Sequence, residues 1–253
     1  MIYDLQKASM WKRASAFLFD VIILVVAIVG MAVILSGVIG YDKHYQNTMA
    51  GYEKYEKQYG VDFSTTADEY AAMSQEEKKQ LDTAYMALWN DEEFVAAYEM
   101  LFNFTFIIIT FGILIAYLIL EFAIPVALGN GQTLGKKIFG IGVMRTDGVK
   151  VVPPLMFIRT VLGKFTLETM IPVYIALMYL FGLIGTLGII IIGLILLVQL
   201  ILMVTTKTNS VIHDVLAKTV AVDLASQMIF ESEEALIAYK EKVHAEQVAR
   251  QTY

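Results

Sequence analysis

Three long apolar stretches constrain this chain most, because each is long enough to cross a lipid bilayer as a helix. They are Ala14–Ile39, Leu101–Leu128 and Leu167–Thr205. The hydrocarbon core of a bilayer is about 30 Å thick, so a crossing helix needs about 20 apolar residues. The third stretch has room for two crossings, and its glycines from Gly182 to Gly188 permit a tight turn between them. We therefore predict an all-α membrane protein with a bundle of four transmembrane helices.

The composition supports this class and excludes several kinds of site. Hydrophobic residues make up 57% of the 253 residues, above the roughly 45–50% of soluble proteins. The chain has no cysteine, which excludes disulfides, thiolate nucleophiles and thiolate metal ligands. The sequence also shows no Ser-His-Asp arrangement and no cluster with metal-ligand spacing. We expect a protein that is not an enzyme and has no cofactor, no bound metal and no nucleic-acid partner.

The distribution of charge predicts the orientation in the membrane. Residues 41–100 include thirteen Asp or Glu against five Lys, whereas residues 129–164 include six Lys or Arg against one Asp. Cytoplasmic loops carry an excess of Lys and Arg near the helix ends. We therefore expect a multi-pass protein of the cell membrane, with both termini in the cytoplasm and the acidic segment outside.

These observations divide the chain into six parts. They are the N-terminus with transmembrane helix 1 (1–40), an acidic extracytoplasmic helical insert (41–100), transmembrane helix 2 (101–128), a cytoplasmic loop (129–166), transmembrane helices 3 and 4 (167–205) and a cytoplasmic C-terminal segment (206–253).

The cytoplasmic loop has two further features. Residues Ile138–Arg145 and Val149–Val152 flank Asp147-Gly148, a pattern typical of a β-hairpin. After Pro153-Pro154, Leu155–Lys164 is predicted to be a short amphipathic helix that lies at the membrane interface and leads into the third membrane helix.

The insert is predicted to be helical and folded. Thr66, Ser74 and Asn90 each precede a Glu by three residues, which is the spacing of a capping box at a helix N-terminus. A mostly aromatic stripe recurs every three to four residues, at Tyr45, Met49, Tyr52, Glu56 and Tyr59. We expect this stripe to pack within the insert; the alternative is a docking face for an extracytoplasmic protein partner.

Two carboxylates interrupt the apolar stretches, Asp20 in the first and Glu121 in the second. A charged side chain costs about 2.5–3.5 kcal/mol in the hydrocarbon on insertion scales, so such residues usually face a bundle interior or a water cavity and have a partner. Both lie near the predicted cytoplasmic end of their stretch and hence at a similar depth. Pro125 lacks an N–H group, so we also expect the carbonyl of residue 121 to be available to another donor or a cation.

Four motifs then occur in a characteristic order. They are Arg13-Ala-Ser-Ala-Phe-Leu-Phe-Asp20, Gly131-Gln-Thr-Leu-Gly-Lys-Lys-Ile-Phe-Gly140, Arg159, and His213-Asp214 with a following Lys-Thr-Val. Together they resemble the RDD family of membrane proteins over residues 10–40 and 101–223. The arginine and two aspartates that give this family its name map onto Arg13, Asp20 and Asp214. The resemblance implies an integral membrane domain linked to transport, including monovalent cation–proton exchange.

The charged residues of the bundle permit two interpretations. In the first, Asp20, Glu121 and Asp214 bind a monovalent cation or a proton, with Arg13, Arg159, Glu168 and His213 as charge partners. In the second, the same residues are structural ion pairs that lock the helices of a non-transporting scaffold, partner-binding or sensor protein.

Residue spacing and the number of helices lead to three further expectations. Arg13 and Asp20 are two turns apart on one helix face, and Arg13 should lower the pKa of Asp20. Glu168 follows Lys164 by one turn and should form a local salt bridge with it. Four helices enclose only a narrow path, so a transporter would be expected to form a homo-oligomer.

Overall fold

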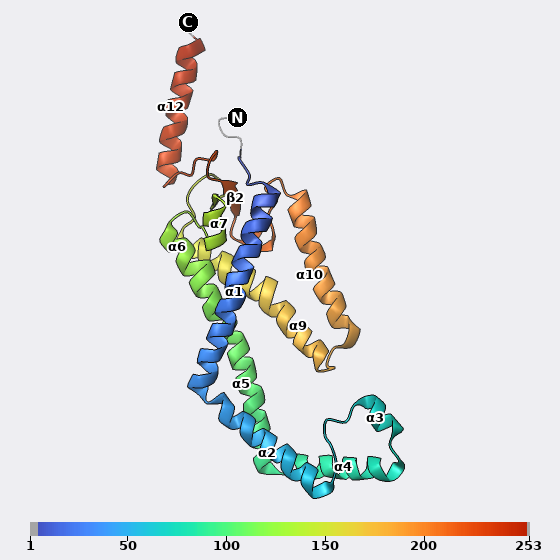
Figure 1. The fold of residues 1–253 in the computed structure, drawn as a ribbon. Helices are drawn as coiled ribbons and strands as arrows, with labels where there is room; N and C mark the ends of the chain where they lie inside the picture. Colours follow the sequence, from blue (N-terminus) through green and yellow to red (C-terminus); the bar gives the residue numbers. More distant parts are fainter. Residues whose placement is uncertain (1–4, 252–253) are drawn as a thin grey trace. The chain divides into compact units, whose positions relative to one another are not determined.

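The computed structural model describes residues 5–251 and is mainly helical (Figure 1). Four helices in this part of the chain are long and apolar enough to cross a membrane: Met10–Ile39, Glu92–Leu128, Pro153–Leu180 and Gly185–Thr205. The predicted all-α fold with four membrane helices is confirmed.

The chain forms two compact units. The core unit comprises Met1–Ile28 and Ile113–Tyr253, and the insert unit comprises Val29–Gly112. Helices α1 (Met10–Ile39) and α5 (Glu92–Tyr117) belong partly to each.

The second membrane helix changes its hydrogen-bond register near its C-terminal end. Helix α5 continues without interruption into the π-helix η1 (Leu118–Ala123) and then into α6 (Ile124–Leu128). Gly129 ends the helix in a left-handed conformation with φ 83°, which glycine adopts without a Cβ penalty.

The third and fourth membrane helices form a hairpin (Figure 1). The third consists of α8 (Pro153–Phe157), the π-helix η2 (Ile158–Met170) and α9 (Ile171–Leu180), and the fourth is α10 (Gly185–Thr205). Gly182 and Gly185 have φ values of 70° and 51°, so the predicted glycine turn is present.

The helix predicted over Leu155–Lys164 continues directly into the third membrane helix, as expected. The side chains of Arg159 and Lys164 are only 4% and 13% exposed, and they pair with Asp214 and Glu121 inside the core unit. The position of this helix at the membrane interface stays a prediction.

A two-stranded antiparallel sheet lies beside these helices. Strand β1 (Ile141–Arg145) follows the short helix α7 (Leu134–Ile138) and pairs with β2 (Thr219–Asp223), so that Val143 faces Ala221. Strand β2 follows α11 (Ile212–Leu216). The sheet interior is a small hydrophobic core in which Met144, Val220 and Val222 pack together.

The predicted hairpin is only partly present. The Asp147-Gly148 turn forms, and the N–H of Arg145 donates to the carbonyl of Val149 at 2.8 Å. Beyond the turn only one bridge, between Met144 and Lys150, continues the pairing. The N–H of Lys150 instead donates to Phe230 at 2.8 Å, so β1 takes its main partner, β2, from the distant C-terminal segment.

The C-terminal segment ends in helix α12 (Glu233–Gln251), as its charged helical sequence suggests. Leu236 and Tyr239 of this helix pack with Val149 and Phe230 in a small hydrophobic cluster. The first turns of α12 are thereby attached to the region after β1.

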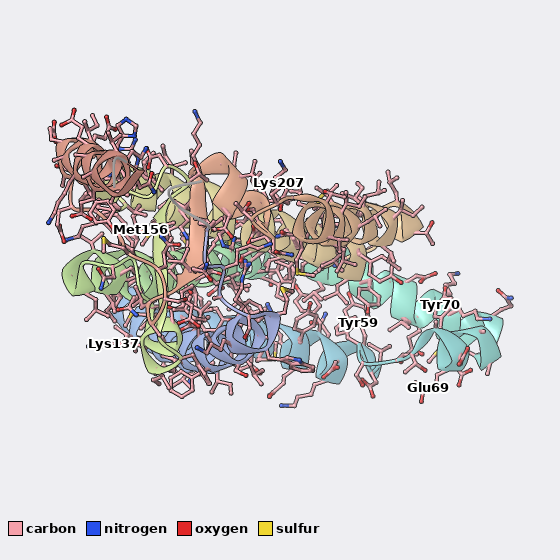
Figure 2. All side chains as sticks on the ribbon, turned by 90° about the horizontal axis from the view of Figure 1, so that it is seen from above. Tyr59, Glu69, Tyr70, Lys137, Met156 and Lys207 are labelled. Atoms are coloured by element: carbon pink, nitrogen blue, oxygen red, sulfur yellow. The ribbon has the colours of Figure 1, made fainter. Side chains whose placement is uncertain are left out.

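The insert unit contains α2 (Tyr41–Tyr59), α3 (Ala67–Ala72) and α4 (Gln75–Trp89). The capping boxes predicted at Thr66 and Ser74 are both confirmed, and Glu69 stands on the outside of α3 (Figure 2). The third is wrong: Asn90 ends α4, and the carboxylate of Asp91 accepts the N–H groups at the start of α5.

Tyr52 of the aromatic stripe packs inside the insert unit, whereas Tyr45 is 48% exposed. The ring of Tyr52 lies 5.1 Å from that of Phe94 and 5.8 Å from that of Phe63, both edge-on. Gly51 allows this close approach, since a Cβ there would lie 2.5 Å from the Phe94 ring. Internal packing, the preferred interpretation of the stripe, accounts for Tyr52.

Candidate functional site

A cavity of about 540 Å³ in the core unit collects the charged side chains of the membrane helices. Its walls come from α1, α10 and α11, the two π-helices and the short helix α7. The acidic and basic residues that line it are Arg13, Asp20, Glu121, Lys136, Arg159, Lys164, Glu168, His213 and Asp214. All the site residues predicted from the sequence are in this set, so the structure brings them together; their binding of an ion stays a prediction.

Asp20 is held by the start of helix α7. The hydroxyl of Thr133, which caps α7, donates to Asp20 Oδ2 at 2.5 Å, and the N–H of Gly135 donates to Oδ1 at 2.7 Å. The ammonium of Lys136 lies 3.8 Å from Oδ2. A glycine is required at position 135, because a Cβ there would lie 2.4 Å from the Ala16 carbonyl oxygen and 2.9 Å from the Asp20 carboxyl carbon. Lys136, and not Arg13 as expected, is the cation that faces Asp20.

Glu121 is 7% exposed and forms an ion pair with Lys164. Its backbone carbonyl accepts a hydrogen bond from the Thr160 hydroxyl at 2.8 Å. The expectation that Pro125 leaves this carbonyl to another donor is therefore confirmed. The predicted salt bridge between Lys164 and Glu168 is wrong, because Lys164 pairs with Glu121 and Glu168 pairs with His213.

The π-helices explain why local spacing failed here. Glu121 lies in η1, and Arg159, Lys164 and Glu168 lie in η2. A π-helix bonds residue i to residue i+5, so residues four apart no longer share the α-helical alignment. π-Helical segments are rare in proteins, and those that occur are often found at functional sites.

Asp214 is the centre of a buried arginine cluster and is 1% exposed. Arg159 donates to its carboxylate and also to the Thr219 hydroxyl at 2.5 Å, and Nη2 of Arg13 lies 3.6 Å from Asp214. Burial alone would raise the pKa of Asp214, but the charge of Arg159, with a lesser contribution from Arg13, holds it well below its usual range. Asp214 is therefore ionised at physiological pH.

His213 connects α11 to η2. Its Nδ1 lies 2.8 Å from the Glu168 carboxylate, which also accepts the backbone N–H of His213 at 2.9 Å. Gly163 permits this contact, because a Cβ there would lie 2.5 Å from the His213 side chain. Burial, together with the charge of Arg159, lowers the pKa of His213. The ring is then neutral at physiological pH, with its proton on Nδ1 toward Glu168.

Lys136, which lines the cavity, has a pKa well below that of an ordinary lysine. Burial lowers its pKa to about 8, and the neighbouring Lys164 adds to this effect, whereas Glu121 and Asp20 oppose it. By contrast, Lys137 beside it is exposed (Figure 2).

Sequence reasoning missed four residues of this site. Thr133, Gly135 and Lys136 were seen only as part of a motif, because nothing local indicates that the loop returns to Asp20. Gln199, which accepts the N–H of Ile212 at 3.1 Å, had a readable signal. It is an amide within the long apolar stretch of α10, where polar residues are costly and tend to be functional.

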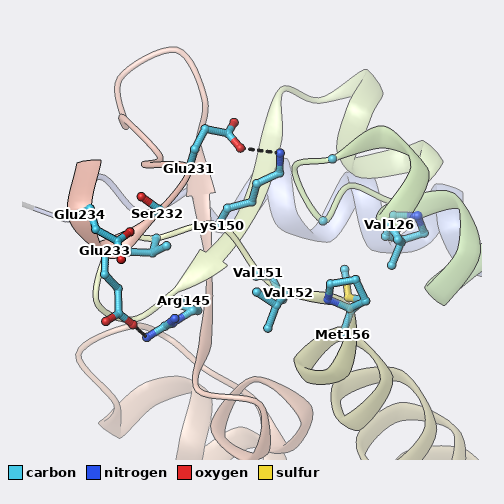
Figure 3. A pocket seen from close by; sticks show the side chains of 15 residues that line it. Val126, Arg145, Lys150, Val151, Val152, Met156, Glu231, Ser232, Glu233 and Glu234 are labelled. Atoms are coloured by element: carbon cyan, nitrogen blue, oxygen red, sulfur yellow. Dashed lines mark hydrogen bonds and ion pairs between the residues drawn. The ribbon is translucent and has the colours of Figure 1, made fainter. Parts of the chain in front are cut away.

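A second cavity, of about 460 Å³, lies between the end of α6 and the start of α12 (Figure 3). Its two cationic side chains are already paired at 2.8 Å and 2.7 Å, Lys150 with Glu231 and Arg145 with Glu233, as the dashed lines in Figure 3 mark. None of the predicted site residues lines it.

Comparison with protein families gives one match. The sequence profile of the RDD family matches residues 7–218, which is most of the chain. This chain belongs to the RDD family. The arginine and two aspartates that the resemblance assigned in this RDD protein, Arg13, Asp20 and Asp214, all line the large cavity. No curated protein and no solved structure shows a significant match to the RDD chain.

Proposed function

We propose that this integral membrane protein exchanges a monovalent cation for a proton through the large cavity of the core unit. The observation that carries the proposal is that Asp20 and Glu121, from two different membrane helices, line one cavity of about 540 Å³. Charged side chains inside membrane helices are costly. They rarely face lipid, and they often mark the path of an ion.

The charges of the cavity support exchange. Four carboxylates (Asp20, Glu121, Glu168 and Asp214) face four bases (Arg13, Lys136, Arg159 and Lys164), so the formal charge is zero with His213 neutral. Loss of the ammonium proton of Lys136, whose pKa burial lowers to about 8, leaves a charge of −1, and entry of one monovalent cation restores zero. An exchange that keeps a membrane-embedded cavity neutral avoids the large cost of a net charge in low dielectric.

A second function also has an observation in its favour. Each of the four carboxylates already has a cationic, histidine or hydroxyl partner, as expected of structural ion pairs in a scaffold or sensor protein. Among the described residues, no three His, Asp or Glu side chains are grouped closely enough to hold a metal ion. A transported cation would therefore have to displace an existing partner.

Transport by purified protein in liposomes separates the two functions. We expect wild-type vesicles with an imposed pH gradient to exchange protons for sodium, potassium or lithium, with no dependence on a membrane potential. Asp20→Asn and Glu121→Gln should abolish the exchange, since each removes a charge but keeps the shape of the side chain. Asp223→Asn, which removes a partly exposed charge outside the cavity, should transport as wild type.

The outcomes decide between the functions. Wild-type vesicles without cation-dependent proton movement under any pH gradient would refute transport. Exchange at the wild-type rate in both cavity variants would show that Asp20 and Glu121 are structural residues.

A further inference from the structure

Arg13 has a hydrogen-bond donor that no group in the described part of the chain accepts. Its Nη1 atom is buried, and no acceptor for it exists among the side chains and backbone that the structure describes. Its Nη2 is 3.6 Å from Asp214, which Arg159 already engages directly. Arg13 and Arg159 therefore share the single carboxylate of Asp214. A buried charged donor without a partner is costly, so an anionic acceptor would fit here.

An apolar wall leads away from Arg13. On α1 it is a stripe with helical spacing, and α10 supplies two more residues; the members are Met10, Ala14, Phe17, Val21, Leu24, Leu200 and Met203. Phe17 is 68% exposed and Leu200 55% exposed, on surfaces that a bilayer would cover. The apolar side of the cavity can therefore be reached from lipid.

The order of charge and apolar surface matches that of a lipid. Arg13 directly precedes the apolar run of α1, at the depth of the membrane interface. At about 1.5 Å of rise per residue, Phe17, Val21 and Leu24 lie roughly 6, 12 and 16 Å deeper. Asp20 is on the same face, but Thr133, Gly135 and Lys136 occupy its carboxylate.

The size of the cavity agrees with such an occupant. A water molecule fills about 30 Å³, and sites for organic ligands are usually about 300–1,000 Å³. At about 540 Å³ the cavity is much larger than a cation requires.

We propose that the cavity also binds an anionic phospholipid, with its phosphate on Arg13 and its first acyl segment along Phe17, Val21 and Leu24. This inference does not depend on cation exchange. A scaffold and a transporter could both hold such a lipid.

Binding of short-chain lipids by the full-length protein, purified and placed in zwitterionic nanodiscs, tests the proposal. We expect saturable binding of dioctanoyl phosphatidic acid that is about tenfold or more tighter than binding of dioctanoyl phosphatidylcholine. Arg13→Gln should weaken the binding of phosphatidic acid by about 10–100-fold, the usual effect of losing a charged hydrogen bond. Lys12→Gln is the matched control, because Lys12 pairs with Asp223 outside the cavity.

A second pair of variants leaves every charge in place. Val21→Trp fills the apolar part of the cavity and should also weaken binding. Ile22→Trp should not, since Ile22 is 56% exposed and does not line the cavity.

Three results would overturn the proposal. Equal affinity for phosphatidylcholine and phosphatidic acid would show that the site does not recognise the negative charge of the lipid. Competition by inorganic phosphate as strong as that by phosphatidic acid would show a free-phosphate site. Wild-type affinity in both Arg13→Gln and Val21→Trp would show that the lipid binds elsewhere.

Discussion

Carboxylate side chains have nearby partners in the insert unit and distant partners in the core unit. In the insert unit, Glu69 and Glu77 bond to Thr66 and Ser74, three residues away, at the exposed starts of helices. In the core unit, Asp20 bonds to Thr133, which is 113 residues away, and Glu121 to Lys164, which is 43 residues away, inside a cavity.

This difference shows how the free-energy cost of a carboxylate depends on whether it stays in contact with water. An exposed carboxylate that caps a helix stays hydrated and gains only a modest local stabilisation. A buried carboxylate loses its hydration and needs partners from several parts of the chain. The core unit should therefore be sensitive to the loss of a single charge, and the insert unit should tolerate it.

The largest effect is expected for Asp214→Asn. It leaves Arg159 and Arg13 buried without their carboxylate, and breaking a buried ion pair typically costs about 3–5 kcal/mol. Denaturation of the purified protein in detergent would measure this loss. Glu231→Gln, which removes the 78% exposed partner of Lys150, is the control and should change stability little. Equal losses in the two variants would contradict the contrast between buried and exposed charges.

A smaller effect is expected for Gly135→Ala. The new Cβ would lie 2.4 Å from the Ala16 carbonyl oxygen and 2.9 Å from the Asp20 carboxyl carbon, and such overpacking costs about 1–3 kcal/mol. Gly30→Ala is the matched control, because nothing lies within 4 Å of a Cβ at that helical position. It should be neutral or stabilising by up to about 1 kcal/mol. If both variants unfold at the same denaturant concentration, the contact between α7 and Asp20 is not tight.

The smallest effect is expected for Asp91→Asn in the insert unit. The Lys54 ammonium and the Tyr55 hydroxyl, with N–H groups at the start of α5, lower the pKa of Asp91 to about 2. A carboxylate with a lowered pKa stabilises the folded state above about pH 4 and loses this effect as the pH falls toward 2.

Hydrogen exchange at pH 7 should show faster exchange near residue 91 in Asp91→Asn and no change in α7. The difference from wild type should vanish at the acid end of this range. Faster exchange in α7 as well would show that the two units are not independent.

The features that could be predicted from the sequence are those fixed within a few residues. Local pattern is enough to predict the four membrane helices, the turn at Gly182 and Gly185, and the capping boxes. It also predicts that the Glu121 carbonyl, four residues before Pro125, accepts a hydrogen bond from outside its own helix. Asp20 and Glu121 were recognisable because a carboxylate in an apolar run has no ordinary explanation. The orientation in the membrane stays a prediction from the Lys and Arg distribution.

The features that could not be predicted depend on distant partners. Lys136 faces Asp20 only because α7 returns to α1, and Lys164 reaches Glu121 only because both helices adopt π register there. Likewise, β1 pairs with β2 because the Asp147-Gly148 turn continues for a single bridge. Spacing along the chain contains no information about such pairs.

The central claim is that the buried charges of the core unit surround a hydrated cavity and are not a dry lock between helices. Because the chain has no cysteine, single cysteines can be tested with a water-soluble, charged thiol reagent. Thr169→Cys and Gln199→Cys, which line the cavity, should react. Ile171→Cys and Leu197→Cys, at exposed positions that do not line the cavity, should not react in a bilayer. Four unreactive cysteines, or equal reaction at all four positions, would contradict a hydrated cavity.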